Sequence, residues 1–133
     1  MEHGFTMKYE VVCGIPDDEF KNGGLQSNEN KYVDKWQEFA KEYFDQTGIY
    51  VSAIANFGKA IYHEDWGCPL HGERTVTFNC TANPTFIKDI EAYKNGVLYI
   101  AGKLKKEFKQ NTITITKMTA GIHYLTNDEV DNV

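Results

Sequence analysis

The chain has 133 residues and a mass of 15.2 kDa, and we expect residues 1–133 to form one domain. Hydrophobic residues make up 41% and charged residues 25%, values that exclude a disordered or fibrous protein. The net charge of −5 argues against a general nucleic-acid binder, and no apolar run approaches the ~20 residues needed to span a membrane.

The first third of the chain predicts a strand, a loop and a helix. Residues 7–14 are rich in β-branched side chains and predict a strand, and residues 15–30 predict a long polar loop. From 31 to 46, apolar and aromatic side chains recur at helical spacing, which predicts a helix with its aromatic face in the core. Asn30 suits its N-cap, and Gly48 suits the position after its last turn.

The middle of the chain predicts a β-hairpin. Residues 49–63 read as a strand, which Gly58 would interrupt with a bulge or tight turn. Residues 64–73 form a turn-rich loop with two glycines and a proline. Residues 74–82 alternate between apolar and polar side chains, as expected of a strand with one buried face.

A second helix is predicted from 84 to about 109. Asn83 is a suitable N-cap, and Pro84 is tolerated at the first helical position because its missing N–H costs nothing there. Within this segment the pair 95–96, Asn-Gly, should loosen or kink the helix, at a cost of about 1 kcal/mol relative to alanine.

The end of the chain completes the pattern of a known fold. Residues 112–117 alternate strictly and predict a strand, 121–125 predict a short extra edge strand, and 126–133 form an acidic tail. The resulting order, βαββαβ, predicts a ferredoxin-like α+β sandwich with two helices on one face of an antiparallel sheet. We expect the open face to be covered by a second copy or a ligand.

Four segments are similar to those of a family of small uncharacterised bacterial proteins. They are KWQEFAKEYFDQTGIYVSA, the Gly58-containing strand, GERTVTF and LKKEFKQNTITI. The shared features are a W-x-x-F helix, a glycine before a long strand, and a closing helix that ends in F-x-Q before a strand. The resemblance spans residues 7–117 and implies the ferredoxin-like fold. Because that family has no established activity, it implies no site residue.

Residue usage also indicates where the protein works. Thirteen lysines accompany a single arginine, Arg74, a bias typical of the AT-rich genomes of low-GC bacteria and their phages. The N-terminus lacks the apolar segment of a secretory signal, so we expect a cytoplasmic protein. The three cysteines, an odd number, are then expected to be free thiols.

The densest group of reactive side chains lies between His63 and Arg74. Cys68 and His71 have the spacing of half a zinc site, and His63 could supply a third ligand. A structural zinc site needs four ligands, and Cys80 or His123 would have to come from elsewhere in the chain. No phosphate-binding loop or G-x-G-x-x-G motif is present. We therefore expect neither a metal nor a cofactor.

The same group permits other chemistry. Cys68 beside an imidazole could act as a nucleophile, and the adjacent acids Glu64 and Asp65 could serve in acid–base catalysis. Arg74 offers a planar fork suited to a carboxylate or phosphate, although it could equally pair with Glu73, Glu64 or Asp65.

Charge is unevenly distributed along the chain. Residues 84–109 carry six lysines and three acids, a net of +3, so the remainder carries −8. A basic helix on an acidic body is either a solvated face or a self-complementary surface that guides assembly.

Together these features predict a non-catalytic binding module, a cytoplasmic homo-oligomer that holds a small anionic ligand or a protein partner. In a phage it could be an accessory factor that captures a host signal or protein. No nucleic-acid or membrane partner is expected. The predicted ligand-binding residues are His63, Trp66, His71, Glu73 and Arg74. The alternative is a small enzyme that uses the 63–74 cluster for acid–base or metal-assisted hydrolysis.

Overall fold

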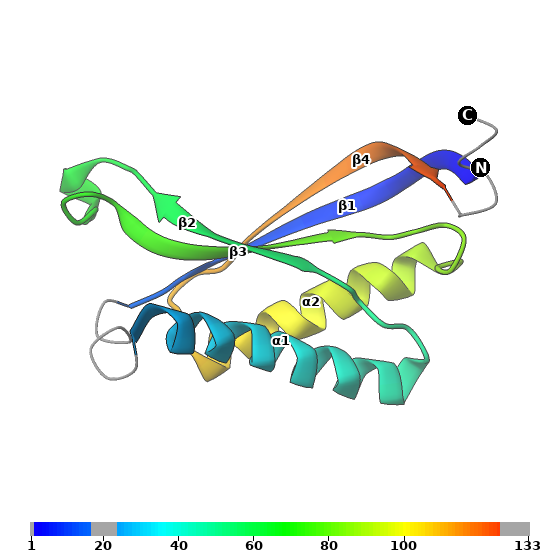
Figure 1. Ribbon diagram of the computed structural model, residues 1–133, viewed down its shortest axis with the longest axis horizontal. Coiled ribbons are helices and arrows are strands. Elements are labelled where there is room, and N and C mark those ends of the chain that lie inside the picture. Colours follow the sequence, from blue (N-terminus) through cyan, green and yellow to red (C-terminus); the bar gives the residue numbers. More distant parts are fainter. Residues whose placement is uncertain (1, 17–23, 126–133) are drawn as a thin grey trace.

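The structure, a computed structural model, describes residues 2–16 and 24–125. The described part contains β1 (Glu2–Gly14), α1 (Gly24–Thr47), β2 (Ile54–Ala60), the short 3₁₀ helix η2 (Glu64–Trp66), β3 (Glu73–Thr81), α2 (Ile90–Glu107) and β4 (Thr114–Tyr124). The strands form one sheet in the order β2-β3-β1-β4, with every neighbouring pair antiparallel (Figure 1). This topology confirms the predicted ferredoxin-like α+β sandwich.

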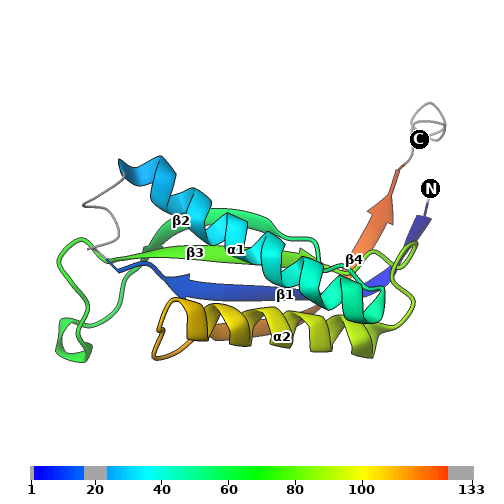
Figure 2. The same cartoon turned by 90° about the horizontal axis from the view of Figure 1, so that it is seen from below.

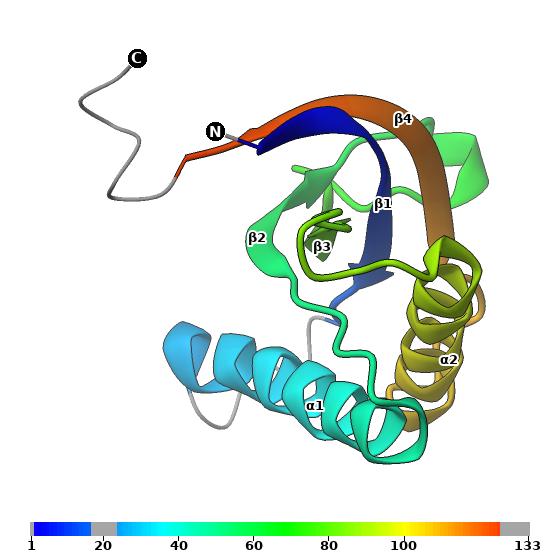
Figure 3. The ribbon, with the colours of Figure 1, turned by 90° about the vertical axis from the view of Figure 1, so that its right-hand side faces the viewer.

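Both long helices lie on one face of the sheet, side by side (Figure 2). The sheet bends over them, most visibly along β1 and β4 (Figure 3). Alternate side chains of the two central strands point toward the helices and are buried, since successive strand residues face opposite sides. These are Tyr9, Val11 and Cys13 on β1 and Val76, Phe78 and Cys80 on β3.

Aromatic side chains of α1 pack in this core, as its helical spacing predicts. The Trp36 ring stacks on Phe78 with ring centroids 4.4 Å apart, and its Nε1 donates a hydrogen bond to the Val51 carbonyl. Tyr32 stacks on Phe108, just after α2, at 4.1 Å. These contacts anchor α1 to both the sheet and the end of α2.

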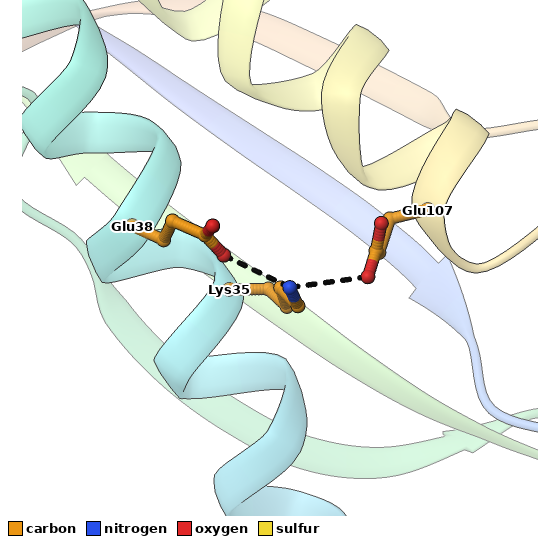
Figure 4. A network of polar contacts seen from close by, with 3 residues as sticks. All are labelled: Lys35, Glu38 and Glu107. Carbon is orange, nitrogen blue, oxygen red and sulfur yellow. Dashed lines mark hydrogen bonds and ion pairs between the residues drawn. The ribbon is translucent and has the colours of Figure 1, made fainter.

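A small polar network joins the two helices at the surface (Figure 4). Lys35 Nζ of α1 lies 2.9 Å from Glu38 Oε2 on the same helix and 3.1 Å from Glu107 Oε1 at the end of α2. Hydrogen bonds to Glu38 and then Glu107 raise the pKa of Lys35, so its charge is retained. All three side chains are partly exposed, so the network orients the helices more than it stabilises them.

The start of α1 differs from the prediction. The helix begins at Gly24, so Asn30 lies inside it and is not its N-cap. Residues 24–30 therefore belong to the helix, and only part of the predicted loop 15–30 remains. Residues 17–23 lie outside the described residues. The polar composition of residues 24–30 lacks the apolar spacing by which a helix is recognised in a sequence.

The strand β2 is shorter than the predicted 49–63, and it contains no bulge. Gly58 pairs with Thr75 in an unbroken register from Ile54↔Asn79 to Ala60↔Glu73. The residues before it form a connection in which Val51 is fully buried, next to Trp36 of α1 and Gly96 of α2. The apolar character of this connection thus comes from core packing and not from strand pairing.

The second helix also starts later than predicted. Asp89 is its N-cap and accepts a hydrogen bond from the Ala92 N–H, whereas Asn83 caps a separate turn through the Thr85 N–H. The pair 95–96 causes no break, because α2 runs continuously from Ile90 to Glu107. Both asparagine and aspartate are good caps, and tertiary packing decided between them.

The predicted strands 112–117 and 121–125 are one strand, β4. It pairs with β1 along its whole length, from Val12↔Thr114 to Glu2↔Tyr124, so there is no separate edge strand within the described residues. The same pairing extends β1 back to Glu2, well before the predicted start at residue 7. The acidic tail at 126–133 lies outside the described residues.

Candidate functional site

The loop of the β2–β3 hairpin projects from one end of the sheet (Figure 1). A cavity of 640 Å³ lies at this end. Its lining comes from the end of β1, the hairpin loop, the start of β3 and the segment after α2. A neighbouring hollow of 260 Å³ shares five lining residues with it: Gly14, Pro16, Tyr62, Glu73 and Gln110. We call the two together the Glu73 cavity.

Tyr62 and Glu73 form the central polar pair of this cavity. The Tyr62 hydroxyl donates a hydrogen bond of 2.7 Å to Glu73 Oε2, and this bond is the main reason that the pKa of Tyr62 is raised. The register of the hairpin brings them together, because Ala60 pairs with Glu73 and Tyr62 follows two residues later. A hydroxyl donor of this kind fixes the orientation of the carboxylate.

The segment after α2 supplies Lys109 and Gln110 to the same cavity. Lys109 has a left-handed backbone (φ 52°), and the Gln110 N–H donates to the Lys105 carbonyl at 2.9 Å, which closes the helix in a Schellman-like turn. Gln110 Oε1 accepts a hydrogen bond of 3.1 Å from the Gly14 N–H. The end of α2 is thereby fixed to the end of β1.

Trp66 forms another wall of the cavity. It belongs to η2 and is 78% exposed, so its ring faces solvent and the cavity. His63 caps η2 by accepting a hydrogen bond from the Asp65 N–H at 3.0 Å, and its ring lies 5.7 Å from that of Trp66. His63 itself does not line the cavity and acts on the turn that carries Trp66.

The other two predicted site residues lie elsewhere. His71 lines a separate hollow of 400 Å³ together with Cys68. Arg74 lines one of 240 Å³ beside Phe57 and Lys59. Arg74 and Glu73 are consecutive in a strand and so face opposite sides of the sheet. The structure thus brings Trp66 and Glu73 to one cavity but not His63, His71 or Arg74, and a binding role for any of the five stays a prediction.

The predicted site lacks most of the residues that line the Glu73 cavity, among them the polar residues Tyr62, Lys109 and Gln110. Tyr62 could have been found from the hairpin register, because it follows a strand that pairs with the one holding Glu73. Gln110 stands in the F-x-Q pattern, but nothing local indicates that it reaches β1. Lys109 reads as one more lysine at a helix C-terminus.

Within residues 2–16 and 24–125, no three His, Cys, Asp or Glu side chains gather closely enough to hold a metal ion. Cys80, a possible fourth zinc ligand, is buried in the core, away from the hairpin loop. The helices of the described part are all too short or too polar to cross a membrane.

Known structures share this fold. A phage SAM lyase in complex with S-methyl-5'-thioadenosine is 14% identical, with a TM-score of 0.50, and the match covers 90% of each chain. A phage SAM lyase in its apo state gives 13% identity, a TM-score of 0.50 and 90% coverage of each chain. A putative PII-like signalling protein from Thermus thermophilus is 9% identical, with a TM-score of 0.43 and 92% of each chain covered.

The family assignment comes from the sequence. No curated protein matches the chain. The model of the SAM lyase family matches residues 4–126. Because a lyase is an enzyme, the prediction of a non-catalytic binding module is wrong, and the alternative of a small enzyme is the better supported. The expectation that its family lacks a known activity is wrong as well. With nearly its whole length matched, the chain belongs to the SAM lyase family.

Proposed function

We propose that this protein cleaves S-adenosylmethionine in the Glu73 cavity, releasing S-methyl-5'-thioadenosine. The observation that carries the proposal is the family match over residues 4–126, because the family is named for this activity. The cavity, with a fixed carboxylate among its lining groups, supplies a place for the reaction.

The charges that line the cavity suit this substrate. S-adenosylmethionine carries a sulfonium and an ammonium cation, a carboxylate, and a flat adenine ring. The Glu73 carboxylate can hold a cationic group, and the Lys109 ammonium can hold the substrate carboxylate. The exposed Trp66 ring offers a face on which adenine can stack.

Cleavage neutralises the sulfonium. When the bond between sulfur and the four-carbon amino-acid chain breaks, its electron pair stays on sulfur, which becomes the neutral thioether of S-methyl-5'-thioadenosine. In the same step an oxygen of the substrate's own carboxylate bonds to the carbon that sulfur leaves, so the four-carbon fragment departs as an aminolactone. The enzyme must therefore bind a cation and hold the scissile bond in a reactive geometry. In this proposal Glu73 binds and orients the cationic part of the substrate, and Tyr62 fixes the carboxylate through their 2.7 Å hydrogen bond.

Replacing either member of this pair should lower the activity. Glu73→Gln removes the charge and should reduce kcat/KM by about 100-fold, the value of a charge-assisted contact of roughly 3 kcal/mol. Tyr62→Phe keeps the Glu73 carboxylate but removes the hydrogen bond that holds it in place, and should reduce kcat/KM by about tenfold. The measurement is the rate of S-methyl-5'-thioadenosine formation from S-adenosylmethionine, followed by liquid chromatography with mass detection.

The chain offers matched controls for both variants. Glu91 is an exposed glutamate of α2 that pairs with Lys94, and Tyr50 is a partly exposed tyrosine in ring contact with Phe44. Glu91→Gln and Tyr50→Phe should leave the rate within twofold of the wild type. Full activity in Glu73→Gln, or no product from the wild type, would overturn the proposal.

We further propose that the chain, as one domain, works as a cytoplasmic homo-oligomer, in the compartment where S-adenosylmethionine is formed and used. Three large apolar side chains of the hairpin loop stand beside the cavity with little cover. Ile61, Trp66 and Leu70 are 82%, 78% and 86% exposed. Such a group of apolar side chains is typical of a contact surface, and a second copy bound there would shield the Glu73 cavity from water.

A further inference from the structure

We infer that Gly14 is a positioning residue of the Glu73 cavity: the space that its missing side chain leaves is the space that the Glu73 carboxylate occupies. The functional part of this inference rests on the proposed lyase activity. Its structural part, that Gly14 sets the position of Glu73, concerns the two residues alone.

The geometry at Gly14 is unusually tight on one side. A Cβ atom built on Gly14 would lie 2.3 Å from Glu73 Oε1 and 3.5 Å from Glu73 Cδ, and the first of these distances is well inside van der Waals contact. Gly14 pairs with Thr75, two residues from Glu73 and therefore on the same face of the sheet. The carboxylate thus lies across the end of β1, directly over the glycine.

Both neighbours of Gly14 take part in the lining of the cavity. The Glu73 carboxylate accepts the hydrogen bond from Tyr62, and the Gln110 amide oxygen accepts one from the Gly14 N–H. Gln110 Oε1 would also lie 3.2 Å from the added Cβ. A side chain at residue 14 would therefore push against the two polar groups that the cavity presents on this side.

The backbone does not require glycine at this position. The glycines with positive φ are Gly48, Gly67 and Gly72 among the described residues, so Gly14 has a conformation that alanine adopts without strain. The obstacle to a Cβ is the far end of a flexible glutamate, which can swing aside. Gly14→Ala should therefore fold normally, and its consequence should be a displaced carboxylate.

The test compares Gly14→Ala with Gly58→Ala. Gly58 is the matched control because it pairs with the same Thr75 from the opposite strand, and a Cβ there meets nothing within 4 Å. Gly14→Ala should lower kcat/KM for S-adenosylmethionine by about 10- to 100-fold at unchanged unfolding midpoint, since a shift of about 1 Å has effects of that size. Gly58→Ala should stay within twofold of the wild type.

The Gly14→Ala substitution made in a Glu73→Ala variant distinguishes an effect on the position of Glu73 from a general effect on the structure. In Glu73→Ala the clashing carboxylate is gone and only the milder contact with Gln110 Oε1 remains, so adding Gly14→Ala should change the remaining activity by less than twofold. An effect of Gly14→Ala that persists in full in this background would overturn the inference, as would equal activity of Gly14→Ala and Gly58→Ala. If Gly14→Ala alone failed to fold, folding restored by Glu73→Ala would support the clash.

A readout without substrate distinguishes failure of this inference from failure of the proposed activity. The pKa of Tyr62 is raised chiefly by its hydrogen bond to Glu73. In Gly14→Ala this pKa should fall toward the ordinary tyrosine value, and in Gly58→Ala it should not. Nuclear magnetic resonance of isotope-labelled tyrosine, with Tyr62→Phe for assignment, measures it. An unchanged Tyr62 pKa in Gly14→Ala would contradict the inference whether or not the protein cleaves S-adenosylmethionine.

Discussion

The Tyr62 hydroxyl donates a hydrogen bond to the Glu73 carboxylate. Tyr62 belongs to a hairpin loop in which the neighbouring side chains are exposed to solvent. Because the bond raises the pKa of Tyr62, the hydroxyl remains protonated beyond the ordinary tyrosine range near pH 10. The carboxylate of Glu73 therefore keeps its hydrogen-bond donor throughout the neutral range. A single residue contact thus gives the cavity an acidic group of fixed position.

Two buried cysteine thiols should make the free energy of unfolding decrease at alkaline pH. Burial raises the pKa of both Cys13 and Cys80 from 9.0 to about 12. Because the folded-state pKa is the higher one, their contribution to the free energy of unfolding is complete below pH 9 and is lost as pH rises through 12. Between about pH 9.5 and about pH 11 each thiol should reduce the free energy of unfolding by about 1 kcal/mol per pH unit.

Urea unfolding at several pH values tests this expectation. The double variant Cys13→Ala/Cys80→Ala should have a lower free energy of unfolding than the wild type below pH 9, because the substitutions leave small cavities. Above about pH 9 its free energy of unfolding should fall less steeply than that of the wild type. Cys68→Ala is the control, because Cys68 is a half-buried cysteine of the hairpin loop. This variant should keep the steep decrease of the free energy of unfolding with pH that the wild type shows. Equal slopes in the wild type and the double variant would refute the assignment.

At the level of elements, the contact between α1 and α2 depends on a glycine. Gly96 is buried, and a Cβ there would lie 2.7 Å from Tyr43 Cε2 and 2.8 Å from Val51 Cγ2. Tyr43 cannot move aside easily, because its hydroxyl donates to the Ala92 carbonyl at 2.6 Å. Gly96 therefore does not weaken α2 as a helix breaker but allows it to approach its neighbours closely.

Two alanine substitutions in α2 should have opposite effects. Gly96→Ala should lower the free energy of unfolding by about 1–3 kcal/mol, because overpacking outweighs the gain in helix propensity. At Gly102, also in α2, a Cβ meets nothing within 4 Å. Gly102→Ala should therefore raise the free energy of unfolding by about 1 kcal/mol. Urea denaturation measures both, and stabilisation by Gly96→Ala would contradict the packing argument.

On the scale of the whole molecule, large apolar side chains are exposed both on the open sheet face and in the hairpin loop. The sheet face opposite the helices carries polar residues such as Thr77 and Asn79, and it also carries Ile54, which pairs with Asn79 and is 69% exposed. The hairpin loop, with Ile61 and Leu70, carries the most exposed apolar groups near the cavity. This loop is therefore the expected contact between copies.

Light scattering after gel filtration tests this assembly. The wild type should have a mass of two or more times 15.2 kDa, and Ile61→Ser/Leu70→Ser should shift this mass toward that of the monomer. Leu98→Ser, at an exposed leucine of α2, is the control and should not change the mass. A wild-type monomer at micromolar concentration would contradict the proposed homo-oligomer.

The sequence by itself determined the order of the elements and the faces they bury. Hydrophobic spacing is a local property, so the aromatic face of α1 and the alternation in β3 could be recognised without neighbours. The family match is likewise a property of the sequence. Boundaries were less well determined, because Asn83 and Asp89 are equally suitable caps and only packing selects Asp89.

Only the tertiary structure decided the candidate site. Trp66 and Glu73 stood in the predicted cluster, but their grouping with Gly14, Lys109 and Gln110 depends on contacts between distant parts of the chain. The hydrogen bond between Gly14 and Gln110 joins residues 96 positions apart. Arg74, adjacent to Glu73, is directed to the other face by strand geometry. Spacing along the chain reports periodicity, whereas a cavity arises where separate elements end together, so the sequence alone does not reveal it.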